Sequence, residues 1–126
     1  MRVLLDTRVL LWALAAPERL PPSLRRLVEE STVLVSTASL WEISIKTALG
    51  KLDADAREIR DAVVPAGFDW LPVDERHALA VSDLPPHHRD PFDRMLVTQA
   101  IVESAPLLTL DAALAGYGSA VRVFAP

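Results

Sequence analysis

The chain has 126 residues, 51% of them hydrophobic, and a mean hydropathy of +0.25, which excludes a disordered polypeptide and fits one folded domain over residues 1–126. A net charge of −4 excludes general attraction of nucleic acid by a positive molecule, so any such contact has to be local. The absence of cysteine excludes disulfides and thiolate zinc sites and fits a reducing cytoplasm.

In chain order, the apolar pattern predicts strands that alternate with helices. A strand at 3–5 stops at Asp6, and the helix after it ends before Pro17. Further helices are predicted after Pro21, at 36–50, 54–66, 75–82 and 91–104, and from residue 112. Further strands are predicted at 33–35, 68–73, 107–110 and 120–124. This alternation indicates an α/β fold with a mainly parallel sheet of four to five strands, covered by helices on both faces.

The apolar start of the chain is predicted to form a strand and a helix rather than a signal peptide. Asp6 and Arg8 interrupt it, and no small-residue cleavage site follows. No run reaches the roughly 20 apolar residues that span a bilayer. We therefore expect a soluble cytoplasmic protein.

Acidic residues occur where the predicted sheet would bring them together. Asp6 directly follows the first strand and Asp111 the fourth, so both belong at the carboxyl edge of the sheet. Asp90 and Asp93 begin the helix before the fourth strand, and Glu42 lies on the 36–50 helix. Carboxylates without cysteine suit Mg²⁺ or Mn²⁺. The pattern indicates metal-assisted phosphodiester cleavage.

Each of these acids also has a structural interpretation. Asp6, Asp90 and Asp111 all suit the N-cap position of the helix that follows, and Asp93 suits a first helical turn. The joint pattern is more informative, because several carboxylates at one sheet edge require either a bound cation or raised pKa values. Asp93 and Glu42 also share helix faces with apolar residues, which favours partial burial.

Basic residues for binding a substrate phosphate lie within four positions of the acids, at Arg8, Lys46, Arg89 and Arg94. The alternative is that they are ordinary solvated charges, with Lys46 forming an exposed i,i+4 pair with Glu42.

The histidines suggest a competing site. His87 and His88 lie close to Asp90 and could indicate zinc or a general base, but adjacent residues in a proline-flanked loop point in different directions. We therefore favour the carboxylate site, and we expect His77 on a helix surface. A G-x-S-x-G elbow and a glycine-rich phosphate loop are both absent.

Four segments, MRVLLDTRVLLWAL, STASLWEISIKTALGKL, LPPHHRDPFDRMLVTQA and LLTLDAALAGYG, together resemble the PIN-domain ribonucleases, specifically the VapC-like toxins of bacterial toxin–antitoxin pairs. The resemblance covers essentially the whole chain. It implies a three-layer α/β/α fold, activity against RNA and dependence on Mg²⁺ or Mn²⁺. It also implies a homodimer and a small cognate antitoxin that blocks the active site.

Carried over by position, the resemblance assigns metal-binding and catalytic roles to four acids, Asp6, Glu42, Asp93 and Asp111. It also points to Thr7 and Thr109 as hydroxyls that hold the acids, and to Asp90 as an additional acid. One or two ions on this cluster would lower the pKa of a bound water and offset charge on the leaving oxygen, while one acid takes the proton.

The chain departs from the family at one position, where Arg8 follows Asp6 and Thr7 in place of the usual histidine. A guanidinium there could grip a substrate phosphate, or it could pair with a carboxylate and compete with the ion. The second possibility defines an alternative function, a catalytically weak or inactive PIN-like binding module with Arg8 in the acidic site.

The first two helices carry more apolar surface than one sheet face requires. This surface either belongs to the core or forms a groove for a partner helix. The residues concerned are Leu10, Leu11, Trp12, Leu14, Leu20 and Leu27.

Overall fold

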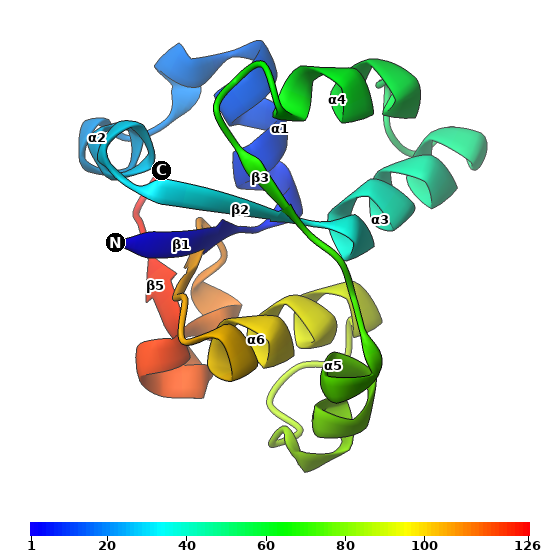
Figure 1. Cartoon of the computed structure of the whole chain (residues 1–126), viewed down its shortest axis with the longest axis vertical. Coiled ribbons are helices and arrows are strands. Elements are labelled where there is room, and N and C mark those ends of the chain that lie inside the picture. The colour runs from blue at the N-terminus through cyan, green and yellow to red at the C-terminus, as the bar shows by residue number, and fades with distance from the viewer.

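The computed structural model describes all residues from 1 to 126, and a five-stranded parallel sheet lies at its centre (Figure 1). The strand order is β3-β2-β1-β4-β5, and every neighbouring pair is parallel. The strands are β1 (Arg2–Leu5), β2 (Thr32–Ser36), β3 (Asp69–Leu71), β4 (Leu107–Thr109) and β5 (Val121–Val123). The predicted parallel sheet is thus confirmed.

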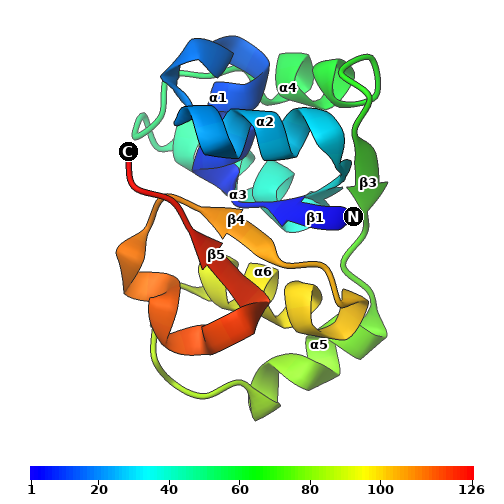
Figure 2. The same cartoon turned by 90° about the vertical axis from the view of Figure 1, so that its left-hand side faces the viewer.

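Helices cover both faces of the sheet and make three layers (Figure 2). On one side lie α1, α2 and α4, and on the other lie α5 and α6. The α-helices are α1 (Thr7–Ala15), α2 (Pro22–Glu30), α3 (Thr37–Ala48), α4 (Ala56–Val63), α5 (Glu75–Ala80) and α6 (Pro91–Glu103). The 3₁₀ segments are η1 (Pro17–Arg19), η2 (Val81–Asp83) and η3 (Ala112–Ala120).

The alternation of side chains along the strands explains the two cores. In β1, Val3 and Leu5 join the core under α1 and α2, whereas Leu4 joins the core against α6. In β2, Val33 packs with the first core and Leu34 with the second. Because both faces of these strands are buried, their sequences are continuously apolar, as expected for a parallel sheet between two helical layers.

Three predicted helices differ in extent or type. The helix predicted at 54–66 is only α4, because Asp55 caps its start by accepting the N–H of Arg57 at 2.9 Å. The helix predicted at 75–82 is divided into α5 and η2. The helix predicted from residue 112 is the 3₁₀ segment η3, interrupted where Gly118 adopts a φ of 69°.

His77 lies in the interior, so its predicted place on a helix surface is wrong. Its side chain is 0% exposed. His77 Nδ1 accepts the N–H of Asp74 at 3.0 Å in a capping box, and Nε2 lies 2.9 Å from Glu103 Oε2. The helix-capping pattern at Asp74 turns the imidazole inward.

The apolar surface of α1 and α2 belongs mainly to the core. Leu10 and Leu20 are buried, and the other four residues are partly buried and pack against the same core. None of the helices combines the length and the apolar character required to cross a bilayer.

Candidate active site

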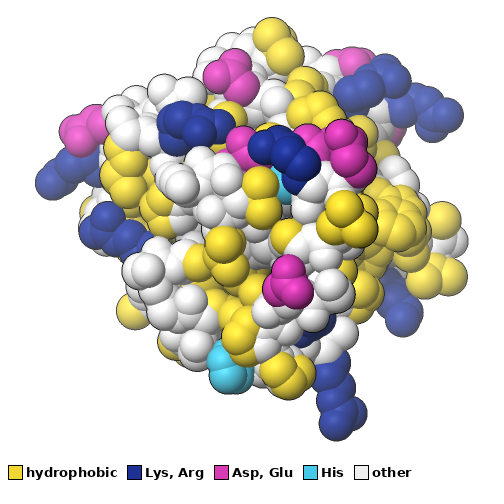
Figure 3. All heavy atoms as spheres, turned by 60° about the horizontal axis from the view of Figure 1, so that its bottom comes forward, with side chains coloured by type: hydrophobic (Ala, Val, Ile, Leu, Met, Phe, Trp, Pro, Cys, Tyr) yellow, Lys and Arg dark blue, Asp and Glu magenta, His cyan; other side chains and the backbone are white.

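The strand order reverses between β1 and β4, and this switch point is where ligands bind in open α/β sheets. A cleft of about 260 Å³ lies there. Its lining residues are Asp6, Thr7, Arg8, Glu42, Asp93, Leu110, Asp111 and Ala112. The structure thus brings together four of the five acids singled out from the sequence, from α1, α3, α6 and the start of η3. Acidic and basic side chains also gather beside hydrophobic surface on one face of the molecule (Figure 3).

Asp6 is buried and held from two sides. One carboxylate oxygen accepts the N–H of Val9 at 2.8 Å, which caps α1, and the other accepts the hydroxyl of Thr109. Burial raises the pKa of Asp6 above its usual value of 3.8, even though both hydrogen bonds favour the ionised form. Asp6 therefore caps the helix and also contributes a costly buried carboxylate to the cleft.

Glu42 reaches the cleft from α3 and is only 7% exposed. Thr7 Oγ1 donates to Glu42 Oε1 at 2.6 Å and lies 3.1 Å from Ser39 Oγ. Lys46 pairs with the other oxygen, and this hydrogen bond raises the pKa of Lys46. The expected i,i+4 pair exists, but its carboxylate is buried. Ser39 was missed by the sequence analysis, although it precedes Glu42 by one helical turn.

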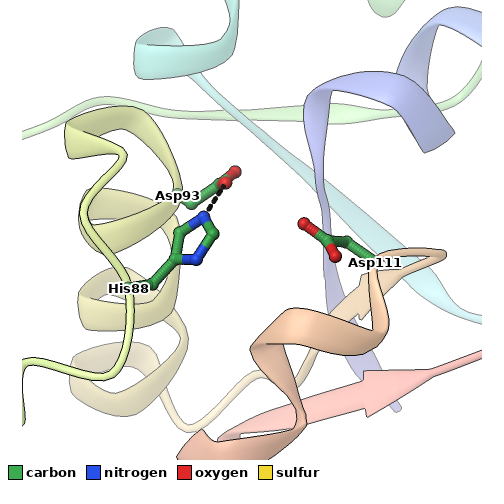
Figure 4. Close-up of side chains that lie close together, drawn as sticks. All are labelled: His88, Asp93 and Asp111. Atoms are coloured by element: carbon green, nitrogen blue, oxygen red, sulfur yellow. Dashed lines mark hydrogen bonds and ion pairs between the residues drawn. The ribbon is translucent and has the colours of Figure 1, made fainter.

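Asp93 lies in the first turn of α6, beside His88 (Figure 4). Asp90 caps this helix by accepting the N–H groups of Phe92 and Asp93 at 2.9 and 3.0 Å, and it does not line the cleft. Burial, followed by the charge of Asp90, raises the pKa of Asp93 to about 6, against the opposing hydrogen bond from His88. His88 Nε2 lies 2.9 Å from Asp93 Oδ2.

Asp111 closes the cluster from the other side of the gap in Figure 4. It is exposed and caps η3 by accepting the N–H of Ala113 at 2.9 Å. Its own N–H donates to Thr109 Oγ1 at 3.0 Å, so the hydroxyl that contacts Asp6 also fixes the turn at Asp111. Ligand atoms of His88, Asp93 and Asp111 all lie within 4.8 Å of one another. His88, which the sequence suggested only for a competing site, thus lies beside the carboxylate cluster.

The four basic residues have different surroundings. Lys46 neutralises part of the cluster, whereas Arg8 lines the cleft with its guanidinium 4.6 Å from the centroid of the Trp12 ring and forms no salt bridge. Arg89 is exposed beside a separate apolar pocket. Arg94 donates to backbone carbonyls of the preceding loop, so its expected role as a phosphate ligand is not retained.

The donor set of the cleft fits a hard divalent cation. Four carboxylates line the cleft, and Lys46 pairs with only one of them, Glu42. Burial raises the pKa values of Asp6 and Asp93, so their ionised forms are unfavourable without further neutralisation. Oxygen ligands without sulfur match Mg²⁺ or Mn²⁺.

Comparison with known proteins gives one family and several similar folds. The model of the PIN domain family matches residues 3–119. A search of curated proteins finds no match. VapBC2 from Rickettsia felis, bound to a DNA fragment from its promoter, has a TM-score of 0.74 at 16% identity, with 99% of this chain and 100% of that chain covered.

Two further structures share the fold. FitAcB from Neisseria gonorrhoeae has a TM-score of 0.64 at 21% identity, with 96% of each chain covered. VapBC-5 from Mycobacterium tuberculosis, a member of the VapBC family of toxin–antitoxin systems, has a TM-score of 0.57 at 22% identity, with 98% of this chain and 97% of that chain covered. At these identities the likeness establishes the three-layer architecture.

Proposed function

The chain belongs to the PIN domain family, and we propose that it is a Mg²⁺- or Mn²⁺-dependent endoribonuclease that acts as the toxin of a toxin–antitoxin pair. PIN domains are generally nucleases. The observation that carries the proposal is the convergence of Asp6, Glu42, Asp93 and Asp111 on one cleft at the switch point of the sheet.

In this proposal Asp6, Glu42 and Asp93 hold the ion, and the hydroxyls of Thr7 and Thr109 keep two of these carboxylates in place. A bound ion supplies positive charge that polarises the phosphate and acidifies water.

The exposed carboxylate of Asp111 accepts the proton as water oxygen bonds to phosphorus and the bond to the leaving oxygen breaks. Its only hydrogen bond within the protein is the helix cap to Ala113, which leaves lone pairs free for this role.

Substrate phosphates are bound by the cations at the rim of the cleft, Arg8 and Lys46, with Arg89 farther out. Local contacts of this kind are needed because the net charge of −4 repels RNA at long range. The position of Arg8 over Trp12, without a salt bridge to any acid, favours an active enzyme over a module whose acidic site is filled by its own arginine.

The proposal includes a cognate antitoxin, a homodimer and a cytoplasmic location. Two proteins of similar fold, from Klebsiella pneumoniae and Mycobacterium tuberculosis, are described as a toxin–antitoxin complex and as a member of a family of toxin–antitoxin systems. The half-buried Leu11 and Leu14 of α1 and Leu27 of α2 offer apolar surface to an antitoxin helix. Trp41 on α3 is 63% exposed, which suits a contact between two copies.

Cleavage of single-stranded RNA tests the proposed activity. We expect cleavage with Mg²⁺ or Mn²⁺, none with EDTA, and a rate about 10²- to 10³-fold lower for Asp6→Asn or Asp93→Asn. Asp61→Asn is the matched control, because Asp61 lies on α4 and pairs only with Arg60. Cleavage that persists in EDTA and in both cleft variants would reject the assignment.

Expression in cells tests the toxin role. Induced expression is expected to slow growth and to leave discrete cuts in cellular RNA, and co-expression of the antitoxin is expected to suppress both. Normal growth with intact RNA, under conditions where the purified protein cleaves RNA, would contradict the toxin role alone.

A further inference from the structure

Arg94 organises the loop that precedes α6. Its Nη1 donates to the carbonyl oxygens of Pro85 and His88 at 3.2 and 3.4 Å, and its Nη2 donates to those of Val81 and Leu84 at 3.3 and 3.4 Å. A planar guanidinium with several donors suits such a multiple contact, which a lysine would not reproduce. The loop carrying His88 is therefore tied to the same helical turn that carries Asp93.

A second contact fixes the loop from the opposite side. The ring of His87 packs edge-on against Tyr117 of η3, with centroids 5.2 Å apart and an interplanar angle of 62°. The two adjacent histidines thus have separate partners, because His87 faces η3 whereas His88 faces Asp93. Anchored at Arg94 and at Tyr117, the loop places the imidazole of His88 in the gap between α6 and the start of η3, as Figure 4 shows.

The contact between His88 and Asp93 selects one carboxylate oxygen. His88 Nε2 lies 2.9 Å from Oδ2, whereas Oδ1 makes no hydrogen bond within the protein. A carboxylate that binds a metal is commonly oriented by a hydrogen bond to its other oxygen, and loss of such a partner weakens metal binding about 10- to 100-fold. An imidazole that donates to Oδ2 leaves Oδ1 for an ion.

We propose that His88 is a positioning residue for Asp93, held in place by Arg94, and that it donates Nε2–H to Oδ2 so that Oδ1 is presented to the divalent ion. This role rests on the proposed metal-dependent function. It differs from direct metal ligation by His88, which the ligand-atom distances alone would also allow.

Mn²⁺ binding by the full chain, measured by calorimetry, tests the role with three variants. His88→Leu removes the donor and is expected to weaken binding about 10- to 100-fold. His88→Gln places an amide N–H near the position of Nε2 and is expected to restore binding to within about threefold of the wild type. His87→Phe is the matched control: it removes the imidazole but keeps an aromatic ring against Tyr117, and it is expected to bind Mn²⁺ as the wild type does.

A double-mutant cycle tests the link to Arg94. Arg94→Met is expected to weaken Mn²⁺ binding in the wild type and to have little further effect in His88→Leu, because both changes remove the same orientation of Asp93. Circular dichroism confirms that each variant is folded. Additive losses in the cycle would overturn the role of Arg94.

Pulsed EPR of bound Mn²⁺ separates positioning from ligation. If His88 only positions Asp93, the spectrum should show no nitrogen coordinated directly to Mn²⁺. A nitrogen coupling that is present in the wild type and absent from both His88 variants would overturn the positioning role. Equal Mn²⁺ binding by the wild type and His88→Leu would overturn the role of His88 and leave the metal site intact. Failure of the wild type to bind Mn²⁺ in an Asp93-dependent way would reject both the metal site and the positioning role.

Discussion

Two histidine–carboxylate pairs at opposite ends of α6 have the same local geometry and different surroundings. His88 Nε2 lies 2.9 Å from Asp93 at the start of the helix, and His77 Nε2 lies 2.9 Å from Glu103 at its end. With a rise of 1.5 Å per residue, the two carboxylates are separated by about 15 Å along the helix.

The charges around each pair decide what it does. Glu103 is also contacted by Arg76 at 2.9 Å and by Arg2 at 3.6 Å. The hydrogen bond from His77, followed by the charge of Arg76, lowers the pKa of Glu103. The pKa of Asp93 is instead raised to about 6, by burial and then by the charge of Asp90. Glu103 forms salt bridges with two arginines, whereas Asp93 forms none with an arginine or a lysine. We therefore expect the two ends of one helix to differ in role, with Glu103 serving stability and Asp93 serving the proposed metal site.

Catalysis is expected to show the largest difference between the pairs. Asp93→Asn should lower the rate of RNA cleavage by about 10²- to 10³-fold, because it removes charge that acts on the transition state. Glu103→Gln should leave the rate within about threefold when assayed where the variant is folded. Single-turnover cleavage with Mn²⁺ measures both, and equal losses in the two variants would contradict this difference in role.

Stability is expected to show the reverse order. His77→Leu should lower the free energy of unfolding by about 3 kcal/mol, because it replaces a fully buried imidazole, leaves the partly buried Asp74 N–H without its acceptor and removes one partner of Glu103. His88→Leu should cost less than about 1 kcal/mol, since this side chain is partly exposed. Urea denaturation at pH 7 measures both values. A similar loss of stability in His77→Leu and His88→Leu would show that the contact between His88 and Asp93 also stabilises the fold.

The pH dependence of the metal-free protein should have opposite signs at the two ends. Because the pKa of Asp93 is raised in the folded protein, this group contributes stability that is fully present below pH 3.8 and is lost as the pH rises through about 6. Because the pKa of Glu103 is lowered, that group contributes stability that is lost as the pH falls. Asp93→Asn should therefore raise the free energy of unfolding by about 1 to 3 kcal/mol at pH 7 in EDTA. Urea denaturation between pH 4 and 8 gives both trends. If Asp93→Asn does not raise the free energy of unfolding, the ionised Asp93 carboxylate does not destabilise the metal-free protein.

Arg8 is expected to show the smallest effect. Arg8→His should change stability by no more than about 1 kcal/mol, the value of the lost contact with Trp12. The rate of cleavage should fall by no more than about fivefold, because Arg8 is one of several cations proposed to bind substrate phosphates and the loss of one such exposed contact costs about 1 kcal/mol. Steady-state kinetics measures the change, and a gain above about 100-fold would show that Arg8 occupies the acidic site in solution.

Local sequence rules account for most of the fold. The sequence predicts the apolar strands that stop before Asp6 and near Thr109, and the helices bounded by Pro22, Gly50 and Pro91. These limits can be predicted because caps and helix breakers act within a few residues. The extent of α4 and the 3₁₀ character of η3 were not readable, since the cap at Asp55 and the positive φ of Gly118 are local conformations with several alternatives.

The sequence also predicts which acidic residues form the candidate site, because the carboxyl ends of parallel strands meet at one edge of the sheet. It does not predict their supporting contacts. Arg94 was expected to bind a substrate phosphate and His88 was set aside as part of a competing site, yet Arg94 binds carbonyls of the loop and His88 contacts Asp93. Side-chain direction in an irregular loop depends on distant partners such as Tyr117.

The sequence by itself determined the order of strands and helices and the set of carboxylates, because both follow from periodicity and from the position of each residue along its element. Only the tertiary structure decided that His77 is buried beside Glu103 and that His88 contacts Asp93 of the cleft. Burial and neighbouring charge control that difference, and for His77 and His88 both come from residues far away in the chain, Glu103, Arg2 and Asp111 among them.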